Sequence, residues 1–335
     1  MSSGVFTIDE QVQAVSHHKP HVVILGAGAS RAAFSNGDRN GRRLPLIQDF
    51  VKTVGLEDVL HENGVDQPYD DFEGLYSNIA SDDLKVRLKN EIERRVFDYF
   101  AELEMPDDPT LYDHLVLSLR PKDIIATFNW DPFLWQATAR NYRFGKAPEL
   151  LFLHGNVAIG YCAACKVVIG RHQTCTCGRT ATPSPILFPV KQKNYQSDPA
   201  ISAHWRTLQS ALKLALTVTF FGYGAPKTDV EAVKLLRHGW GDPDSRIMEE
   251  TEIIDVRAEA ELEATWSPFI HSHHYCIRRS FYDSNLAKHP RRSCEAIWGR
   301  VGEARFVDVA TFPESADFNA LYRWLQPRID AESSV

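Results

Sequence analysis

Four cysteines in two close pairs carry the clearest chemical signal in this sequence of 335 residues. Thiolates spaced in this way are typical ligands of a tetrahedral Zn²⁺ ion, and Gly178 follows the second pair, where a metal-binding turn needs flexibility. All four ligands would be sulfur, so the zinc would have no open position and we expect it to be structural. His172 lies between the pairs and is an alternative to one of the cysteines. The cysteines are Cys162, Cys165, Cys175 and Cys177.

Polar residues also stand directly after two short apolar runs. His154 follows one run, with a glycine after it that leaves room for a substrate, and Asn129 follows the other. Side chains at the carboxyl ends of parallel strands lie where open α/β sheets bind ligands. Histidine titrates near neutral pH, so His154 suits general-base work, with a hydrogen-bonded core histidine as the alternative. Asn129 suits a ligand contact. Asp131 precedes Pro132, so it is either a second contact or a helix N-cap.

A glycine-containing turn at residues 26–30 follows the first apolar run of the chain and reads Gly-Ala-Gly-Ala-Ser. This order is typical of a loop that holds a dinucleotide phosphate, because glycines let the backbone approach the ligand and the next helix offers N–H groups. Arg31 stands where dehydrogenases have a third glycine, and Asp49, at the spacing of their ribose-binding acid, lies in a helical pattern. The turn therefore predicts a nucleotide loop outside that class, with an ordinary tight turn as the alternative.

Buried parallel strands must position these side chains. Short runs of apolar, often β-branched residues favour such strands, and 44% hydrophobic residues in a chain of this length suffice for a sizeable core. The expected fold is therefore α/β, either one large domain with an insertion or two domains. The first three predicted strands cover residues 21–25, 123–127 and 150–153.

Residues 45–120, between the first two strands, are predicted to be helical and to form an insertion. The clearest helix covers residues 82–103, in which apolar side chains recur at four-residue steps. The stretch 35–43 before the insertion is rich in Asn, Gly and Arg, so it is either a mobile lid over the glycine turn or an ordinary surface loop. The apolar positions of the helix are Leu84, Leu88, Ile92, Val96 and Phe100.

Composition excludes several classes of function. A formal net charge of −7 and a pI near 6.0 argue against a general nucleic-acid-binding surface. No apolar run approaches the length of a membrane span, and the first residues lack a signal-peptide pattern. We therefore expect a cytoplasmic protein without a membrane partner, in a reducing compartment that favours metal over disulfides for the clustered cysteines.

The C-terminal residues 261–335 are expected to be an extension that completes the domain. The histidines at 271–274 have metal-like spacing but are expected at the surface, and Cys276 and Cys294 are expected to be buried or free thiols. Residues 318–325 predict a closing amphipathic helix. Four arginines form a basic patch for which a solvated face is favoured over contact with a partner or nucleic acid. They are Arg278, Arg279, Arg291 and Arg292.

Four segments in a fixed order make this sequence resemble the sirtuin family. The turn at 26–30 matches the family's GAG-x-S loop, and residues 127–131 match its T-Q-N-I-D strand end. His154 and Gly155 match the H-G pair that contains the family's catalytic histidine, and the four-cysteine cluster matches its zinc ribbon. Each motif is short, but their common order makes the combination specific.

Three later segments extend the resemblance over roughly residues 20–260. Residues 220–224 are similar to the family's glycine-containing strand end for the dinucleotide, and residues 252–256 to its last core strand, with Asp255 where an Asn is usual. Residues 222–229 resemble the G-Y-S-x-P-x-T-D segment of divergent bacterial sirtuin-like proteins. Many of those proteins act in antiviral defence by hydrolysing NAD.

The resemblance implies that NAD is the substrate and that a zinc ion is structural. The family breaks the nicotinamide–ribose bond through an oxocarbenium-like transition state. By resemblance, Asn129 positions the ribose or the attacking water, His154 is the base, and Asp131 contacts the nicotinamide end. The other implied NAD contacts are Gly26, Ala27, Gly28, Ser30, Gly222, Tyr223, Asp229 and Asp255.

The resemblance also implies a division of the chain. The expected fold class is a sirtuin-like, Rossmann-type parallel sheet with a helical insertion and a small four-cysteine zinc module. The NAD-binding domain would include both sides of that module. The expected parts are an N-terminal extension at 1–20, the NAD-binding domain at 21–155 and 184–260 with its insertion at about 45–120, the zinc module at 156–183 and the extension at 261–335.

Departures from the protein-deacylating sirtuins favour hydrolysis of NAD to ADP-ribose and nicotinamide. Deacylases continue the first loop as S-G-I-P-D-F-R, whereas this chain continues with Arg31, and Phe128 and Trp130 replace a Gln and an Ile. Their peptide-binding V-x-F-G-E segment has no clear counterpart in residues 185–191, which keep only its apolar start. The alternatives are an NAD-dependent protein deacylase and a sensor that binds NAD or a nucleotide derivative without cleaving it.

A free NAD hydrolase would be toxic to its own cell. We therefore expect a defence effector that stays inactive until oligomerisation, a regulatory protein partner or an activating nucleotide releases it. The expected assembly is a homo-oligomer or a hetero-complex, with no role for nucleic acid.

Overall fold

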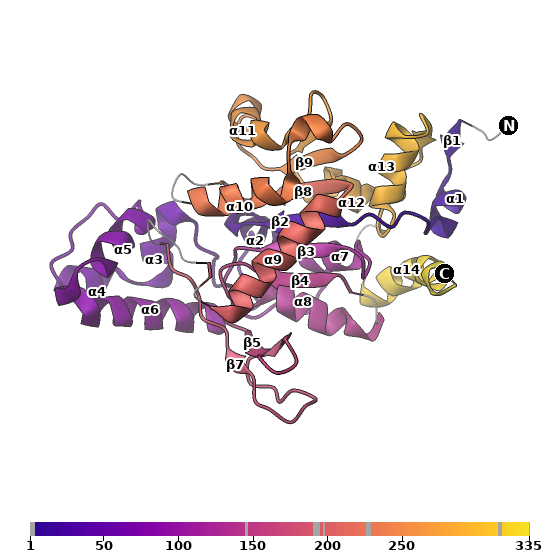
Figure 1. Ribbon diagram of the computed structural model, residues 1–335. Coiled ribbons are helices and arrows are strands. Elements are labelled where there is room, and N and C mark those ends of the chain that lie inside the picture. Colours follow the sequence, from indigo (N-terminus) through magenta and orange to yellow (C-terminus); the bar gives the residue numbers. More distant parts are fainter. Residues whose placement is uncertain are drawn as a thin grey trace.

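The computed structural model describes residues 4–144, 147–189, 195–196, 198–225, 229–313 and 317–334. A six-stranded, wholly parallel sheet lies at its centre (Figure 1). The strands in spatial order are β4 (Glu149–Phe152), β3 (Ile124–Thr127), β2 (His21–Leu25), β8 (Thr217–Phe221), β9 (Glu250–Ile254) and β10 (Tyr275–Arg278).

The strand order is that of a doubly wound nucleotide-binding fold. Counted along the chain, the order reads 3-2-1-4-5-6, so it reverses between β2 and β8. In sheets of this kind, ligands bind in the crevice at the carboxyl ends of the two strands that flank the reversal. The predicted α/β class with a parallel sheet is confirmed, and two of the three strand predictions shift by one residue.

The register brings all six strands to an end at one level. Leu25 pairs with Thr127 on one side and with Phe221 on the other, and Phe221 pairs with Ile254. The outer strands continue this row, because Thr127 pairs with Phe152 and Ile254 with the last residue of β10. The segments that follow the strands therefore meet along one edge of the sheet.

Helices cover both faces because the strands are apolar on both. In β2, Val23 and Leu25 pack into one core cluster, while Val22 and Ile24 pack into the other. The first cluster includes side chains of α7 and α8, and the second includes those of α9, α10 and α11. The bounds are α2 Ala27–Ala33, α7 Leu111–Leu117, α8 Phe133–Asn141, α9 Pro199–Leu214, α10 Val230–Trp240 and α11 Glu259–Trp266.

The helical insertion between β2 and β3 lies at one side of the sheet (Figure 1). Its longest helix, α6, begins at Val86 rather than at 82, because Asp82 caps a short 3-10 turn by accepting a hydrogen bond from the backbone of Leu84. Leu84 is consequently 95% exposed, so its predicted place in the apolar stripe is wrong, while the other four positions are buried. The helices are α3 (Phe50–Val54), α4 (Glu57–Glu62), α5 (Phe72–Ala80) and α6 (Val86–Ala101).

The stretch 35–43 is a surface loop held by hydrogen bonds. The buried carboxylate of Asp38 accepts hydrogen bonds from the backbone N–H groups of Asn40, Arg42 and Glu104. These bonds tie the loop to the end of α6, and the cavity described below is lined by residues 44–48 instead. The structure thus places this stretch in a surface loop, and its movement as a lid stays a prediction.

A small antiparallel sheet carries the four cysteines and projects from the main body beyond β4 (Figure 1). It contains β5 (Ile159–Cys162), β6 (Val167–Gly170) and β7 (Thr182–Pro183). The first cysteine closes β5, and the other three lie in the two turns that follow. A four-cysteine module is thus part of the fold, as predicted.

The first and last helices of the described chain, α1 and α14, lie on the side opposite the insertion (Figure 1). There β1 (Val5–Phe6) pairs in parallel with β11 (Phe306–Val307). The predicted basic patch is wrong for Arg291 and Arg292, because both are buried and share an ion pair with Glu332. The remaining helices are α1 (Ile8–Gln13), α12 (Asn285–Lys288), α13 (Ser293–Val301) and α14 (Phe318–Ser333).

No helix in the described part of the chain is long and apolar enough to cross a membrane.

Candidate active site

A cavity of about 610 Å³ opens at the carboxyl edge of the sheet, across the point where the strand order reverses. This volume lies in the range of ligand sites, about 300–1,000 Å³. Every residue that the sequence associates with NAD lines the cavity. These residues are Gly26, Ala27, Gly28, Ser30, Asn129, Asp131, His154, Gly222, Tyr223, Asp229 and Asp255.

The glycine turn after β2 is packed against the turn after β8. The N–H of Gly26 donates to the carbonyl of Phe221, and that of Gly28 donates to the carbonyl of Gly222, each at 3.0 Å. A Cβ at Gly26 would lie 2.5 Å from the Cα of Tyr223, and one at Gly222, where φ is +60°, would lie 2.2 Å from the N of Ala29. Contact between the two turns therefore already requires these glycines, whatever ligand they meet.

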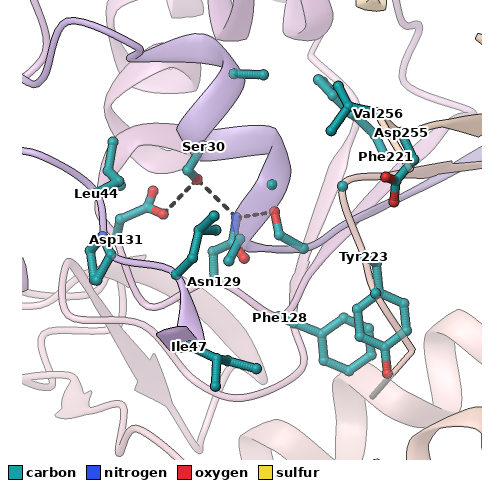
Figure 2. Close-up of a pocket in the computed structure, with 18 of the residues that line it drawn as sticks. Ser30, Leu44, Ile47, Phe128, Asn129, Asp131, Phe221, Tyr223, Asp255 and Val256 are labelled. Carbon is teal, nitrogen blue, oxygen red and sulfur yellow. Dashed lines mark hydrogen bonds between the residues drawn. The ribbon is translucent and has the colours of Figure 1, made fainter. Parts of the chain in front are cut away.

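Asn129, Ser30 and Asp131 form a buried polar cluster beside this turn (Figure 2). The amide nitrogen of Asn129 donates to the Gly26 carbonyl and to the Ser30 hydroxyl, both at 2.9 Å. The Ser30 hydroxyl donates to the Asp131 carboxylate at 2.7 Å. With its nitrogen committed to these partners, Asn129 accepts no hydrogen bond at its amide oxygen from the residues that the structure describes. Asn129 can thus offer an oriented acceptor to a ligand.

Asp131 is a carboxyl group buried away from water. Burial raises its pKa from 3.8 to about 6, although hydrogen bonds from Ser30 and from the Phe133 backbone oppose the shift. The helix N-cap role is partly realised, because its carboxylate accepts from the Phe133 N–H at 3.2 Å, but Pro132 is the N-cap of α8. Tyr112 closes the cluster from behind with a 2.7 Å hydrogen bond to the Ser30 hydroxyl.

Asn156 supports the segment that follows β3 through hydrogen bonds, a role that the sequence analysis did not predict. It is fully buried, and its amide nitrogen donates to the carbonyls of Asp131 at 2.6 Å and Asn129 at 3.3 Å. Its amide oxygen accepts from the backbone N–H of Ala158. The Asn156 side chain therefore holds the backbone at both Asn129 and Asp131, the two predicted site residues of this segment. The signal for it was an asparagine directly after the His-Gly pair.

His154 is buried among aromatic rings at the end of β4. Its Nε2 lies 3.0 Å from the hydroxyl of Tyr195, and the Phe128 ring stands edge-on to it with the centroids 4.8 Å apart. The glycine after it does not leave room for a substrate as predicted, since a Cβ at Gly155 would lie 1.6 Å from the carbonyl oxygen of Pro185. The site thus surrounds His154 on several sides while leaving it on the cavity wall.

Phe128, which stands where the sirtuin motif has a glutamine, fills the space between two strand ends. Its ring stacks on that of Tyr223 with the centroids 4.2 Å apart and the planes at 11° (Figure 2). The Tyr223 hydroxyl in turn donates to the carboxylate of Asp229 at 3.3 Å. Trp130 likewise contacts Phe50 and Phe100 edge-on. Phe128 and Trp130 are therefore both packing residues of the cavity wall.

Acidic and basic groups meet at the other end of the cavity, after β9 and β10. The carboxylate of Asp255 accepts hydrogen bonds from the guanidinium of Arg257 at 2.9 and 3.1 Å. Arg279 donates to the backbone carbonyl of Arg257, and Tyr282 completes this wall. The sequence analysis identified Asp255 but missed Arg257, whose role depends on a contact made only in the fold.

The cavity spans several strands of the sheet. Asp255 follows β9 and Asn129 follows β3, and β8 and β2 lie between them. Neighbouring strands are about 4.8 Å apart, so these two ends of the cavity lie about 14 Å from each other. The site therefore suits an elongated ligand with distinct groups at its ends.

The four cysteines fit a tetrahedral metal ion. Their sulfur atoms all lie within 4.8 Å of one another, and those of Cys162 and Cys177 are 3.6 Å apart. Sulfur ligands about 2.3 Å from a tetrahedral zinc would be separated by about 3.8 Å, so the donor set matches zinc. Within the described residues, neither His172 nor the histidines at 271–274 join such a cluster. The alternative ligand His172 is therefore not supported, and the cysteines do not line the cavity.

Some residues named in the sequence analysis lie outside the described residues. They are Pro226, Lys227 and Thr228 of the segment after Gly222, and Val190 and Lys191 of the segment after β7.

No family model matches the sequence, and no curated protein matches it. Solved structures of Sir2 enzymes are similar to it in overall shape. One, described as the structural basis for the mechanism and regulation of Sir2 enzymes, has a TM-score of 0.38 at 13% identity and covers 85% of this chain and 91% of that chain. Two complexes of mutant Sir2 homologues with ADP-ribose have TM-scores of 0.37 and 0.40 at 14% and 11% identity, covering 85% of this chain and 93% of the other. At such low scores and identities, this similarity assigns no activity or site residue to the chain.

Proposed function

We propose that this chain breaks the nicotinamide–ribose bond of NAD and transfers the ADP-ribose to water. The observation that carries the proposal is the cavity at the strand-order reversal, which combines a buried amide, hydroxyl and carboxyl cluster with a histidine. A doubly wound sheet binds nucleotides at that position, and about 14 Å between the two ends suits a dinucleotide. The sequence motifs that resemble the sirtuin family lie on the walls of the same cavity.

Each end of the cavity has a distinct part in this proposal. Asp255 would accept hydrogen bonds from ribose hydroxyls at the adenosine end, beside the positive charge of Arg257. At the other end, Asn129 would orient the nicotinamide ribose or the water with its amide oxygen. Asp131 would face the nicotinamide, where a carboxyl with a pKa of about 6 can exist in either protonation state near neutral pH.

The reaction needs a group that takes one proton. The bond from C1′ to the nicotinamide nitrogen breaks with its electron pair passing to the ring, and a water oxygen forms the new bond to C1′. His154 would accept the proton that this water loses, and a positioned base contributes about 10²–10⁴-fold to such a rate. The aromatic walls at Phe128 and Trp130 would keep other water away from the cation-like ribose.

Packing of the segment after β7 supports water rather than an acylated peptide as the acceptor. The N–H of Leu187 donates to the carbonyl of His154 at 2.8 Å, and the Phe188 ring stacks on Tyr76 and packs against Trp130. The Leu187 N–H and the Phe188 ring are therefore engaged by contacts within the chain. The segment is also the one that lacks the deacylase peptide-binding motif.

A protein deacylase is the second candidate, and one observation favours it. The side of the cavity formed by the insertion is apolar and aromatic, with Phe50, Phe72 and Phe100 on its wall. Such a wall would accept an acyl chain, although it would equally accept a nicotinamide ring.

Incubation with NAD, with and without acylated peptides, separates the candidates. We expect nicotinamide and free ADP-ribose in equal amounts without any peptide when the chain is in its assembled or activated form. Strict dependence on an acylated peptide would replace the proposal by deacylation. Protection against heat by NAD with no release of nicotinamide would indicate a sensor that binds without cleaving.

We also propose that the activity is gated and serves antiviral defence in the cytoplasm. The support is the resemblance to divergent bacterial sirtuin-like proteins and the toxicity of a constantly active NAD hydrolase. Gating by assembly, a regulatory partner or an activating nucleotide predicts a low rate for the isolated chain. A full rate in a sample that stays monomeric at all concentrations would contradict gating by oligomerisation.

A further inference from the structure

The end of the cavity after β9 and β10 carries more positive charge than the proposed NAD contacts require. Among the described residues that line the cavity, the two arginines, Arg257 and Arg279, both lie at this end. Asp255 and Arg279 stand at matching positions, because each directly follows a strand and the last residues of those strands, Ile254 and Arg278, are paired in register. Both arginines therefore lie where the proposed function places the adenosine ribose.

Asp255 has little acceptor capacity left for a ligand. Its Oδ1 accepts from the backbone N–H of Arg257 at 3.0 Å, and its Oδ2 accepts from two N–H groups of the Arg257 guanidinium at 3.1 and 2.9 Å. A carboxylate offers about four acceptor positions, so with these contacts of the described residues about one remains for the ribose. The adenosine ribose of NAD presents two neighbouring hydroxyls. One of them can use Asp255, and the other position needs a different partner.

Arg279 is a cation without a matching acid. Its guanidinium donates through Nη1 to the backbone carbonyl of Arg257, and its side chain makes no ion pair or further hydrogen bond with the residues that the structure describes. The Arg257 guanidinium, by contrast, is neutralised by Asp255 and also pairs with Glu261. Arg279 is exposed and an arginine is always charged, so it keeps its charge and most of its N–H groups for a ligand.

Ser280 adds a second donor beside this charge. Its hydroxyl oxygen accepts from the Tyr282 N–H at 3.2 Å, whereas its proton finds no acceptor within the described part of the chain. Ser280 directly follows Arg279 and also lines the cavity. A guanidinium and a hydroxyl proton suit a phosphate group, because phosphate oxygens accept several hydrogen bonds and an arginine can bind two of them at once.

We infer that this end of the cavity accepts a phosphate group on the adenosine ribose, so that NADP is a substrate alongside NAD. In doubly wound folds, an acid at this place binds the 2′-hydroxyl of NAD, and a nearby arginine accommodates the 2′-phosphate of NADP. This chain has both: Asp255 takes the 3′-hydroxyl with its remaining acceptor position, and Arg279 with Ser280 takes the 2′-phosphate. The inference rests on the proposed function for the orientation and cleavage of the dinucleotide.

Calorimetric binding of two ligands that contain no nicotinamide tests the phosphate subsite separately from the reaction. ADP-ribose and ADP-ribose 2′-phosphate differ only in the proposed phosphate. We expect Arg279→Gln to raise the ratio of the Kd for the phosphorylated ligand to the Kd for ADP-ribose about 10-fold, because it removes a charge-assisted hydrogen bond. Arg279→Lys keeps the charge and should stay closer to the wild type. Arg237→Gln is the matched control and should leave the ratio unchanged, since Arg237 is an exposed arginine of α10 outside the cavity.

Two binding results would overturn the inference. One is a wild type that binds ADP-ribose but not its 2′-phosphate. The other is an equal loss of affinity for both ligands in Arg279→Gln, which would make Arg279 a general contact of the adenosine end.

Nicotinamide release from NAD and from NADP then tests the substrate. We expect release from both by the assembled or activated form, and Arg279→Gln should lower the ratio of kcat/KM for NADP to kcat/KM for NAD about 10-fold. Release from NAD with none from NADP would overturn the inference. If neither dinucleotide releases nicotinamide while the ratio of Kd values changes as expected, the proposed function fails and the phosphate subsite stands.

Discussion

Substitution of Gly222 by alanine tests the close packing between the turn after β2 and the turn after β8. The new Cβ would lie 2.2 Å from the N of Ala29 and 2.4 Å from the carbonyl carbon of Gly28. These neighbours are backbone atoms, so they cannot rotate away as a flexible side chain would. The turns after β2 and β8 must therefore move apart.

The magnitude follows from three losses. Alanine at a φ of +60° costs about 1 kcal/mol. Separation of the turns also breaks the hydrogen bonds from Gly26 and Gly28 to the β8 turn, each worth about 1 kcal/mol net. We therefore expect Gly222→Ala to lower the free energy of unfolding by about 3 kcal/mol, before any cost of the displaced strands.

Gly224→Ala is the matched control two residues away. A Cβ at Gly224 would meet no atom of the described residues within 4 Å, and the φ of Gly224 is not in the left-handed region. Urea unfolding followed by circular dichroism should show a lower midpoint for Gly222→Ala and a midpoint close to wild type for Gly224→Ala. Equal stability of Gly222→Ala and wild type would refute the packing of the two turns.

Two further predictions concern the buried carboxyl and the metal. The pKa of Asp131 is raised in the folded state from 3.8 to about 6, so its protonated form adds stability at low pH that is lost as the pH rises from about 4 to about 6. Relative to Asp131→Asn, the wild type should therefore lose about 3 kcal/mol of unfolding free energy over that interval, and a difference that does not change with pH would contradict this. The wild type should contain about one zinc per chain by elemental analysis, and Cys165→Ser should lose it and melt at a lower temperature. Cys276→Ser, outside the cluster, should keep its zinc, and zinc loss in that variant would disprove the assignment to the four cysteines.

Local signals explain most of what could be predicted from the sequence. The strand and turn at 21–30 and the cysteine pairs are contiguous, so their composition alone indicates their structure. The strand ends could be predicted to meet because parallel strands bring their carboxyl ends to one edge. The residues expected at the carboxyl edge of the sheet can therefore be predicted from the sequence before the fold is known.

Contacts between distant segments explain what could not be predicted. Tyr195 and His154 are 41 residues apart in the sequence, and so are Arg291 and Glu332. No local sequence pattern therefore indicates either contact. Leu84 matches the apolar periodicity of the predicted helix. In the structure, Asp82 instead begins a 3-10 turn, and the Leu84 side chain is exposed to solvent. The sequence predicts that Gly155 leaves room for a substrate. That prediction is wrong because the backbone at Pro185 fills the space, and the position of this distant segment cannot be predicted from the sequence.

Release of nicotinamide from NAD by the purified chain, compared with His154→Ala and Asn129→Ala, tests the central claim most directly. The account predicts release by the wild type, without peptide and in the assembled or activated form, and a loss of about 10²-fold or more in each variant. Circular dichroism and NAD-dependent thermal shifts should show that both variants remain folded. Full activity in either variant, or no release by the wild type in any assembly state, would contradict it.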